Sequence, residues 1–259
     1  MDHFKIFVNL TRLNKPIGYM LLFWPCSWGL AYAYKIANEL NIFLYYLFLF
    51  FLGSILMRSA GCIVNDIVDQ DLDKKVQRTK NRPLASGNIS NARAIIYSAI
   101  LCFISFFILI QFNFKTILLG LSSMILAFAY PFMKRFTYWP QLFLGLTFNW
   151  GMIMGYTAIL DQISTEIIIL YVSAIFWTLG YDTIYGIQDV ADDEIIGVKS
   201  TAIKFKKNIK LFVSICYLIS LLLIIITFAN SIKINLSTLF IIMFILSLIY
   251  QLKIFNKDN

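Results

Sequence analysis

Long apolar runs alternate with short polar stretches along the whole chain. Eight runs reach the roughly 17 to 25 residues that a helix needs to cross the hydrocarbon core of a bilayer. They cover residues 17–34, 42–64, 94–112, 116–132, 139–160, 167–185, 211–229 and 236–252. Their Leu, Ile and Phe residues lack the period-two alternation of membrane barrel strands, and a lipid-exposed backbone must satisfy its own hydrogen bonds. The pattern therefore predicts an all-α, polytopic transmembrane helical bundle of eight spans.

The polar stretches between the runs are short, so we expect one domain over residues 1–259. Composition agrees with a membrane location. The chain is 59% hydrophobic and 14% charged, whereas a soluble domain has roughly 45–50% apolar and about 25% charged residues. This balance argues against a soluble fold and indicates an integral membrane protein.

Basic residues favour one side of the predicted membrane, and Lys and Arg in short loops stay on the cytoplasmic side. The N-terminus, the second, fourth and sixth loops and the C-terminus hold Lys5, Arg12, Lys15, Lys74, Lys75, Arg78, Lys80, Arg82, Lys134, Arg135, Lys199, Lys204, Lys206, Lys207, Lys210, Lys253 and Lys257. The other four loops supply only Lys35, Lys115 and Lys233. We therefore expect both termini and the even loops in the cytoplasm. The richness in Ile, Asn and Lys is typical of a low-GC bacterial genome, so the membrane would be a bacterial inner membrane.

The net charge of +8 follows from this topology. Charges scattered over separate loops do not form the single basic stripe that is typical of nucleic-acid binding. On the cytoplasmic side they favour contact with anionic lipid headgroups. We therefore expect the protein to contact the lipid bilayer, to bind no nucleic acid and to need no obligate protein partner.

Acidic residues are concentrated in two places. Nine of the 14 acidic residues are Asp66, Asp69, Asp71 and Asp73, after the second run, and Asp182, Asp189, Asp192, Asp193 and Glu194, from within the sixth run onward. We call these two stretches the first and the second acidic segment. Each lies at the predicted cytoplasmic end of its span, so the sequence predicts the active site at that end of the bundle.

Helical periodicity orders the first acidic segment. If the second span continues as a helix at about 100° per residue, Asn65, Asp66, Asp69 and Asp73 fall within an arc of roughly 100°, and Asp71 points away. One acidic face therefore follows from the spacing.

The same periodicity orders the second acidic segment. On the assumption of one continuous helix, Asp182, Asp189 and Asp193 share an arc of roughly 40°, with Tyr185 about 60° away on the flank. Tyr185 is then a candidate substrate contact or a packing residue. We expect the two acidic faces to meet across a shared cation.

The acidic faces point to a metal and a phosphate. Clustered carboxylates repel one another unless a cation lies between them. Oxygen ligands favour Mg²⁺, whereas zinc prefers His or Cys, which neither acidic segment contains. The stretch after the first segment supplies cations that suit phosphate oxygens, namely Lys74, Lys75, Arg78, Lys80 and Arg82. Acid, metal and base together indicate a site for a magnesium diphosphate.

A simpler interpretation is that the two acidic segments are only solvated loop charges. Two ionisable residues inside predicted spans are relevant to it. Asp182 argues against it, because an ionisable residue inside a span costs about 2.5–3.5 kcal/mol and is a functional candidate. The role of Arg58 has two interpretations: its side chain pairs with such a carboxylate, or it extends its charge to the membrane interface.

The motifs NDxxDxxxD at 65–73 and DxxYxxxDxxxD at 182–193 resemble the paired motifs of UbiA-type intramembrane prenyltransferases. The segments 12–18, 24–25, 78–84, 130–135 and 196–201 resemble the 4-hydroxybenzoate polyprenyltransferase branch of that family. Together they cover about the first 205 residues. A lone DxxxD would be a weak signal, but several motifs in the same order are specific.

The resemblance implies an enzyme that uses Mg²⁺ and a polyprenyl diphosphate to join an isoprenoid tail to 4-hydroxybenzoate in ubiquinone synthesis. It implies that the metal diphosphate is bound by Asn65, Asp69, Asp73, Asp189 and Asp193, with support from Asp66 and Asp182. It suggests Arg78, Arg82, Tyr130 and Lys134 as diphosphate contacts. Arg135 and Arg12 are candidates for the benzoate carboxylate, or they are cytoplasmic anchor arginines.

In the reaction that this resemblance implies, the allylic C–O bond ionises, the ring carbon ortho to the hydroxyl attacks, and a carboxylate of the second segment takes a proton. Family members have nine spans where this pattern predicts eight, so we expect either a truncated C-terminus or a member without the last span. Two alternatives remain open. One is a related prenyltransferase with naphthoate, homogentisate or haem as acceptor, and the other is a divalent-cation transporter.

Overall fold

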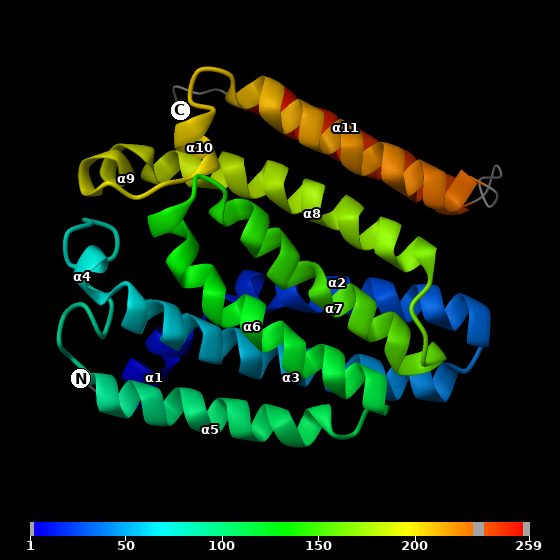
Figure 1. The fold of residues 1–259 in the computed structure, drawn as a ribbon, viewed down its shortest axis with the longest axis horizontal. Helices are drawn as coiled ribbons and strands as arrows, with labels where there is room; N and C mark the ends of the chain where they lie inside the picture. The colour runs from blue at the N-terminus through cyan, green and yellow to red at the C-terminus, as the bar shows by residue number, and fades with distance from the viewer. Residues whose placement is uncertain (1–2, 230–235, 256–259) are drawn as a thin grey trace. The chain divides into compact units, whose positions relative to one another are not determined.

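The computed structural model describes residues 3–229 and 236–255, and within these ranges all regular structure is helical (Figure 1). Each of the eight predicted runs is occupied by a helix. These helices are α2 (Pro16–Ala37), α3 (Leu40–Val68), α5 (Asn91–Leu109), α6 (Phe114–Phe136), α7 (Pro140–Leu160), α8 (Thr165–Tyr185), α11 (Ile209–Phe228) and α12 (Leu236–Ile254). The short elements are α1 (His3–Thr11), α4 (Gln70–Asp73), the 3₁₀ helix η1 (Gly186–Asp189), α9 (Val190–Ile196) and α10 (Thr201–Lys204). The prediction of an all-α fold is confirmed.

Six helical stretches within the described ranges are long and apolar enough to cross a membrane by length and composition. They are Leu40–Val68, Asn91–Leu109, Phe114–Phe136, Pro140–Leu160, Thr165–Ile196 and Ile209–Phe228. Neither α2 nor the described part of α12 is in this set. The count of eight spans therefore stays a prediction, as does the topology, for which Lys233 and Lys257 lie outside the described residues.

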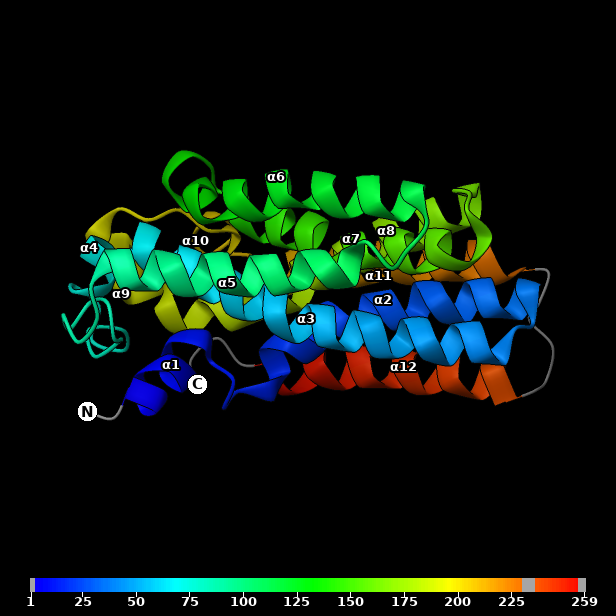
Figure 2. The same ribbon diagram turned by 90° about the horizontal axis from the view of Figure 1, so that it is seen from below.

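The chain divides into two compact units. Unit 1 comprises Met1–Phe132 and Thr147–Ile163. Within it, α3 packs between α2 and α5, and the three helices run side by side in Figure 2. The amphipathic helix α1 contributes Ile6 and Leu10 to a core that contains Ile63 of α3, so it is fixed to the outside of α3.

Small residues allow α2 and α7 to pack closely within unit 1. A Cβ atom added at Gly29 would collide with the backbone of Met152, and one added at Gly155 would collide with the backbone of Cys26. Glycine is favoured at such contacts because it lets two helix backbones approach. These two glycines therefore have a packing role.

Unit 2 comprises Met133–Leu146 and Ser164–Asn259. Its main contact is between α8 and α11, which lie side by side in Figure 1. The Ser173 hydroxyl donates to the carbonyl oxygen of Ser220 at 2.9 Å, and the Tyr217 ring covers Gly180. These contacts hold α8 firmly along α11 and so fix the helix that leads into the second acidic segment.

Candidate functional site

The first acidic segment keeps a nearly helical path beyond the end of α3. The backbone N–H of Asp69 donates to the Asn65 carbonyl at 2.9 Å, and that of Asp73 donates to the Asp69 carbonyl at 2.8 Å. Asp66 and Asp69 are each 1% exposed and Asp73 is 6% exposed, whereas the side chain of Asp71 is 90% exposed. The arrangement agrees with the expected acidic face, from which Asp71 points away.

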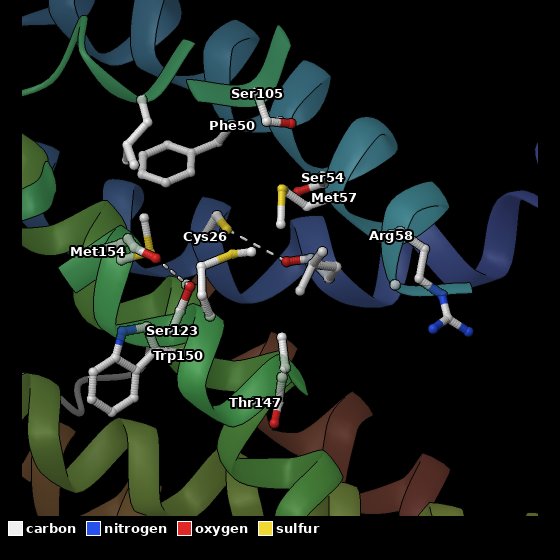
Figure 3. A pocket seen from close by; sticks show the side chains of 18 of the residues that line it. Cys26, Phe50, Ser54, Met57, Arg58, Ser105, Ser123, Thr147, Trp150 and Met154 are labelled. Atoms are coloured by element: carbon white, nitrogen blue, oxygen red, sulfur yellow. Dashed lines mark hydrogen bonds between the residues drawn. The ribbon is translucent and has the colours of Figure 1, made fainter. Parts of the chain in front are cut away.

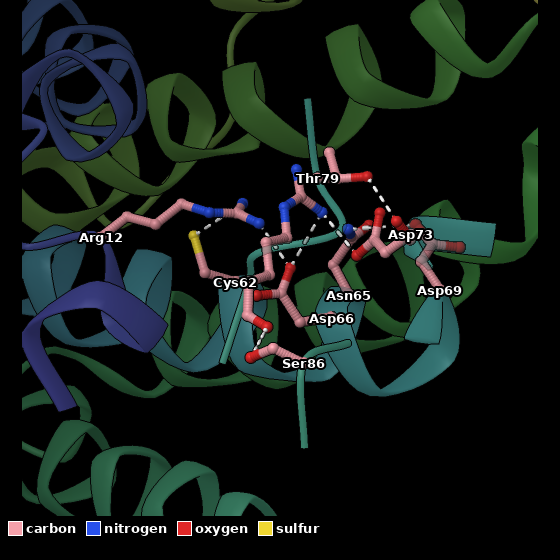
Figure 4. A network of polar contacts seen from close by, with 9 residues as sticks. Arg12, Cys62, Asn65, Asp66, Asp69, Asp73, Thr79 and Ser86 are labelled. Atoms are coloured by element: carbon pink, nitrogen blue, oxygen red, sulfur yellow. Dashed lines mark hydrogen bonds and ion pairs between the residues drawn. The ribbon is translucent and has the colours of Figure 1, made fainter. Parts of the chain in front are cut away.

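Two arginines reach this acidic face, and Arg12 comes from a distant part of the sequence (Figure 4). Arg12, in the turn after α1, pairs through Nη2 with Asp66 Oδ1. The Nη1 atom of Arg82 lies 3.2 Å from the same Asp66 oxygen and 2.8 Å from Asp73 Oδ2. We call Arg12, Asp66, Asp73 and Arg82 the ion-pair network; it links the N-terminus, the end of α3 and the loop after α4.

Burial and neighbouring charges act in opposite directions on Arg12 of the ion-pair network. Burial by itself would lower the pKa of the Arg12 guanidinium, but Asp66, Cys62 and Asp73 together outweigh burial and raise that pKa above its ordinary value. Arg12 also adopts φ 56°, a left-handed conformation that is uncommon for a residue other than glycine. The ion pair therefore holds a strained turn in place.

The loop between α4 and α5 folds back on the acidic face. The hydroxyl of Thr79 donates to the Asp73 carbonyl at 3.1 Å, and the amide of Gln70 donates to the Leu84 carbonyl at 3.1 Å. These bonds close the loop on both sides of Arg82 and direct its guanidinium toward the carboxylates. Arg78 lies on the same loop with an exposed side chain.

The oxygen atoms of the first acidic segment fit a magnesium ion that arrives with a phosphate. The Asn65 amide donates to Asp69 Oδ2 at 3.2 Å, and the buried Oδ2 of Asp66 accepts no hydrogen bond from the described residues. Across the described part of the chain, no three His, Cys, Asp or Glu side chains gather closely enough to hold a metal by themselves. Mg²⁺ commonly takes one or two carboxylates and completes its shell with water and substrate phosphates, and Asn65, Asp69 and Asp73 supply oxygen donors of that kind.

A cavity of about 400 Å³ lies within unit 1 (Figure 3). Residues of α2, α3, α5, α6 and α7 line it, most of them apolar, and Arg12, Asn65 and Tyr130 also belong to its wall. The cavity therefore includes residues of the first acidic segment and of the ion-pair network. An elongated apolar space that borders charged groups suits an amphiphilic ligand.

Arg58 is the other charged residue in the cavity wall. Its guanidinium carbon lies 5.3 Å from the centroid of the Phe148 ring. Its buried Nε has no acceptor among the described residues. The Arg58 side chain thus borders the cavity and lies over an aromatic ring, and no ion pair with a carboxylate is found for it among the described residues. That its charge extends to the membrane interface stays a prediction.

The second acidic segment departs from the expected single helix. The α8 helix ends at Tyr185, and a 3₁₀ turn, Gly186–Asp189, precedes α9. A 3₁₀ helix advances by about 120° per residue, about 20° more than an α-helix. The expected arc of 40° for Asp182, Asp189 and Asp193 is therefore wrong. The four residues of η1 turn Asp189 and Asp193 further around the helix axis than an α-helix would. Tyr185 is 60% exposed.

Backbone contacts in unit 2 bring the end of α6 beside the stretch that follows α9. The N–H of Lys199 donates to the Lys134 carbonyl at 2.8 Å, and its Nζ donates to the Phe136 carbonyl at 3.3 Å. The Lys204 ammonium lies 4.5 Å from the centroid of the Trp139 ring. Lys134 and its neighbour Arg135 are thus joined to the stretch after the second acidic segment, although the two stretches are far apart in the sequence.

The candidate residues from the sequence fall into separate groups. In unit 1 the structure gathers Arg12, Asn65, Asp66, Asp69, Asp73 and Arg82, and Tyr130 borders the same cavity as Arg12 and Asn65. In unit 2 it places Lys134 and Arg135 as described, and Asp182, Asp189 and Asp193 along α8, η1 and α9. Whether the two acidic faces meet stays a prediction. The cavity and the position of Arg58 in it were missed, because tertiary packing creates both.

Known proteins share long stretches of sequence with this chain. A model of the UbiA prenyltransferase family matches residues 22–259. The mitochondrial 4-hydroxybenzoate polyprenyltransferase of Arabidopsis thaliana is 48% identical over 209 residues, which are 80% of this chain and 51% of that protein. The Caenorhabditis elegans protein of the same name is 49% identical over 81% of this chain and 59% of its own length. The chain thus spans between half and three fifths of these two relatives.

A bacterial relative is covered more fully. The 4-hydroxybenzoate octaprenyltransferase of Psychromonas ingrahamii is 44% identical over 85% of this chain and 75% of its own length. The relatives thus come from a plant, an animal and a bacterium. The six apolar helices and the family match indicate an integral membrane protein.

Solved structures share the fold. The apo structure of a UbiA homolog from Aeropyrum pernix K1 superposes with a TM-score of 0.76 at 25% identity, covering 90% of this chain and 86% of that one. A UbiA homolog from Archaeoglobus fulgidus bound to GPP and Mg²⁺ superposes with a TM-score of 0.74 at 18% identity, covering 96% and 87%. With a family model that matches nearly the whole length and relatives at 44–49% identity, the chain belongs to the UbiA prenyltransferase family.

Proposed function

We propose that this chain transfers a polyprenyl group from polyprenyl diphosphate to 4-hydroxybenzoate, at the ring carbon ortho to the hydroxyl, in ubiquinone synthesis. The observation that carries the proposal is the elongated apolar cavity whose wall includes Asn65 and Arg12, next to three buried aspartates. A tail and a charged head group need such a space. Relatives named for this reaction share 44–49% identity over 80% or more of the chain.

The diphosphate head would be held by metal ions and by basic side chains. We assign metal binding to the first acidic segment through Asn65, Asp69 and Asp73, and to the second through Asp189 and Asp193. We assign diphosphate contacts to Arg78, Arg82, Tyr130 and Lys134. Bound Mg²⁺ would supply positive charge to the diphosphate oxygens, so that this group leaves more readily.

Asp66 has a different role from the other aspartates in this proposal. It is 1% exposed and pairs with both Arg12 and Arg82. A carboxylate that pairs with two guanidinium groups orients both of them. Asp66 is therefore a positioning residue for the ion-pair network, and Arg82 remains close enough to Asp73 to accompany a bound diphosphate.

The chemistry requires one bond to break and one to form. The allylic C–O bond breaks and its electron pair leaves with the diphosphate; the ring carbon then forms a C–C bond to the allylic carbon and loses its proton. A carboxylate of the second acidic segment, from Asp182, Asp189 or Asp193, takes that proton. The allylic cation needs protection from water, and the mostly apolar wall of the cavity would provide it.

Arg58 is the best candidate for the carboxylate of the acceptor. The sequence suggested Arg12 and Arg135, but Arg12 is already paired with Asp66. Arg58 borders the cavity and its buried Nε has no acceptor among the described residues. It precedes Asn65 by seven residues on α3, which leaves about 10 Å along the helix for the aromatic ring. A benzoate carboxylate would satisfy Arg58.

The location follows from the distribution of Lys and Arg. We propose a bacterial inner membrane, with the N-terminus and both acidic segments on the cytoplasmic side, where short loops retain basic residues. The active site would then take its diphosphate from the cytoplasmic face.

One experiment tests the proposed function. Membranes that contain the protein are incubated with 4-hydroxybenzoate and geranyl, geranylgeranyl or longer prenyl diphosphates, with and without EDTA. Prenylated 4-hydroxybenzoate should form only when divalent metal is present. Naphthoate and homogentisate serve as competing acceptors; preferential prenylation of either would overturn the assigned acceptor, and metal uptake into vesicles without any prenyl transfer would favour a transporter.

A further inference from the structure

The cavity in unit 1 is long in the direction of α3. Residues of α3 that line it run from Leu49 to Asn65, which is about 24 Å at 1.5 Å per residue. Phe50 and Phe112 also belong to its wall, and their ring centroids lie 4.7 Å apart. In Figure 3 Phe50 and Arg58 lie at opposite ends of the side chains that are drawn. The cavity therefore extends from the first acidic segment to an aromatic end.

Two glycines of α3, Gly53 and Gly61, belong to this wall. A Cβ atom added at either position would meet no heavy atom within 4 Å. The glycines between α2 and α7 are different, because Gly29 and Gly155 allow backbones to touch. Gly120, which also lines the cavity, has a neighbour as well, since an added Cβ would lie 2.5 Å from Leu109 Cδ1. Packing thus explains these other glycines but not Gly53 and Gly61.

A glycine inside a helix needs a compensating reason. It destabilises the helix by about 1 kcal/mol relative to alanine. Neither Gly53 nor Gly61 has a positive φ or a close neighbour. The absence of a side chain at these two positions leaves open space on the cavity side of α3.

The two glycines lie at different angles around α3 from the charged residue Arg58. At about 100° per residue, Gly53 is about 140° around α3 from Arg58, and Gly61 is about 60° from it. Met57, which lines the cavity, lies between the two glycines around the helix. The side of α3 that bears Gly53 and Met57 is therefore apolar, and Gly61 lies between that side and Arg58.

We propose that Gly53 and Gly61 form the passage for the isoprenoid tail and determine which tail lengths the protein accepts. This inference rests on the proposed function. Measured from Asn65, Gly61 lies about 6 Å and Gly53 about 18 Å along the helix axis. An extended isoprene unit has four carbon–carbon bonds of about 1.5 Å each and advances by about 5 Å. With the diphosphate at Asn65, Gly61 faces the first or second unit, and Gly53 faces the third or fourth.

A side chain introduced at each depth should therefore act on different donors. Gly53→Leu leaves the 10-carbon geranyl tail unaffected and obstructs the 20-carbon geranylgeranyl tail. Gly61→Leu obstructs both. Leucine is a strong helix former, and its Cβ atom meets no neighbour within 4 Å at either position, so the variants should fold.

The experiment has two measurements. The first is kcat/KM for transfer to 4-hydroxybenzoate from geranyl and geranylgeranyl diphosphate. The second is direct binding of the two labelled diphosphates to the purified protein in detergent with Mg²⁺, which does not require the transfer reaction. For Gly53→Leu we expect the preference for geranyl over geranylgeranyl to rise by about tenfold in both measurements, since overpacking of that size changes an equilibrium by about this factor. For Gly61→Leu we expect losses of about tenfold for both donors.

Matched controls distinguish an effect on the width of the cavity from an effect on the stability of the helix. Gly53→Ala should change the preference far less than Gly53→Leu. Phe48→Leu, on the outward side of α3 where the side chain is 59% exposed, should change neither donor.

The outcomes distinguish the two proposals. Equal effects of Gly53→Leu on both tail lengths, or no effect of either leucine variant on binding, would overturn the inference even if the wild-type protein is active. A wild-type protein that binds both diphosphates but prenylates no 4-hydroxybenzoate would overturn the proposed function, and the binding series would still decide the role of the glycines.

Discussion

Arg12→Met should destabilise the protein through Asp66. The substitution keeps most of the apolar stem of the side chain and the same backbone conformation, so it removes the charge with little change in strain. Removing one partner of a buried ion pair costs about 3–5 kcal/mol, because the other charge stays buried. Asp66 is 1% exposed but keeps Arg82 at 3.2 Å. We therefore expect a smaller loss, about 2–3 kcal/mol in the free energy of unfolding.

A double-mutant cycle isolates the pair. The free energy of unfolding is measured in detergent for Arg12→Met, Asp66→Asn and the double variant. We expect the double variant to be more stable than the sum of the single losses predicts by about 1–2 kcal/mol, because the neutral amide introduced by Asp66→Asn needs no counter-ion. Lys74→Met is the matched control, since Lys74 and Asp71 form a largely exposed pair, and its effect should stay within about 0.5 kcal/mol.

The result that would refute this reasoning is additivity. If Arg12→Met and Asp66→Asn destabilise independently, the two side chains do not interact in the folded protein. If Lys74→Met costs as much as Arg12→Met, burial does not decide the strength of these pairs. A further readout is protease sensitivity near residue 12: the α1 helix should become easier to cleave in Arg12→Met, because the ion pair helps to fix the turn that follows it.

Three further outcomes test the site. Asp69→Ala and Asp189→Ala should each abolish prenyl transfer, by more than about 100-fold, while the protein stays folded in the membrane; near-normal turnover of either variant would contradict the metal assignment. Arg58→Gln should raise the KM for 4-hydroxybenzoate by about tenfold or more with little change in that for the diphosphate, and a larger acceptor effect of Arg135→Ala would move the carboxylate site there. Gly155→Leu should prevent stable folding, as measured by thermal unfolding, because it forces α2 away from α7; an unchanged melting temperature would show that this contact is not close.

The hydrophobic pattern predicted the fold well because lipid imposes helices on long apolar runs. Each of the eight runs contains a helix, and the acidic face of the first segment follows from the period of 3.6 residues. The partners of that face were not accessible to the same reasoning. Arg12 lies 54 residues from Asp66 in the sequence, and no periodicity relates them.

The second acidic segment shows the limit of periodicity. The expected arc assumed uniform winding, but η1 winds more tightly between α8 and α9. Gly186 and the following residues carry no strong signal for a 3₁₀ turn, since such turns depend on tertiary contacts at helix ends. The cavity and the two open glycines in its wall likewise depend on how five helices pack, which a single sequence does not encode in any local pattern.

The contacts of Lys199 with the end of α6 have a mechanical consequence. Its backbone N–H and its side chain donate hydrogen bonds to the carbonyl groups of Lys134 and Phe136. The Lys204 ammonium lies over the ring of Trp139, just after that end of α6. The basic pair Lys134 and Arg135 is therefore not free to swing by itself. If the stretch after the second acidic segment shifts when a ligand binds, Lys134 and Arg135 move together with it.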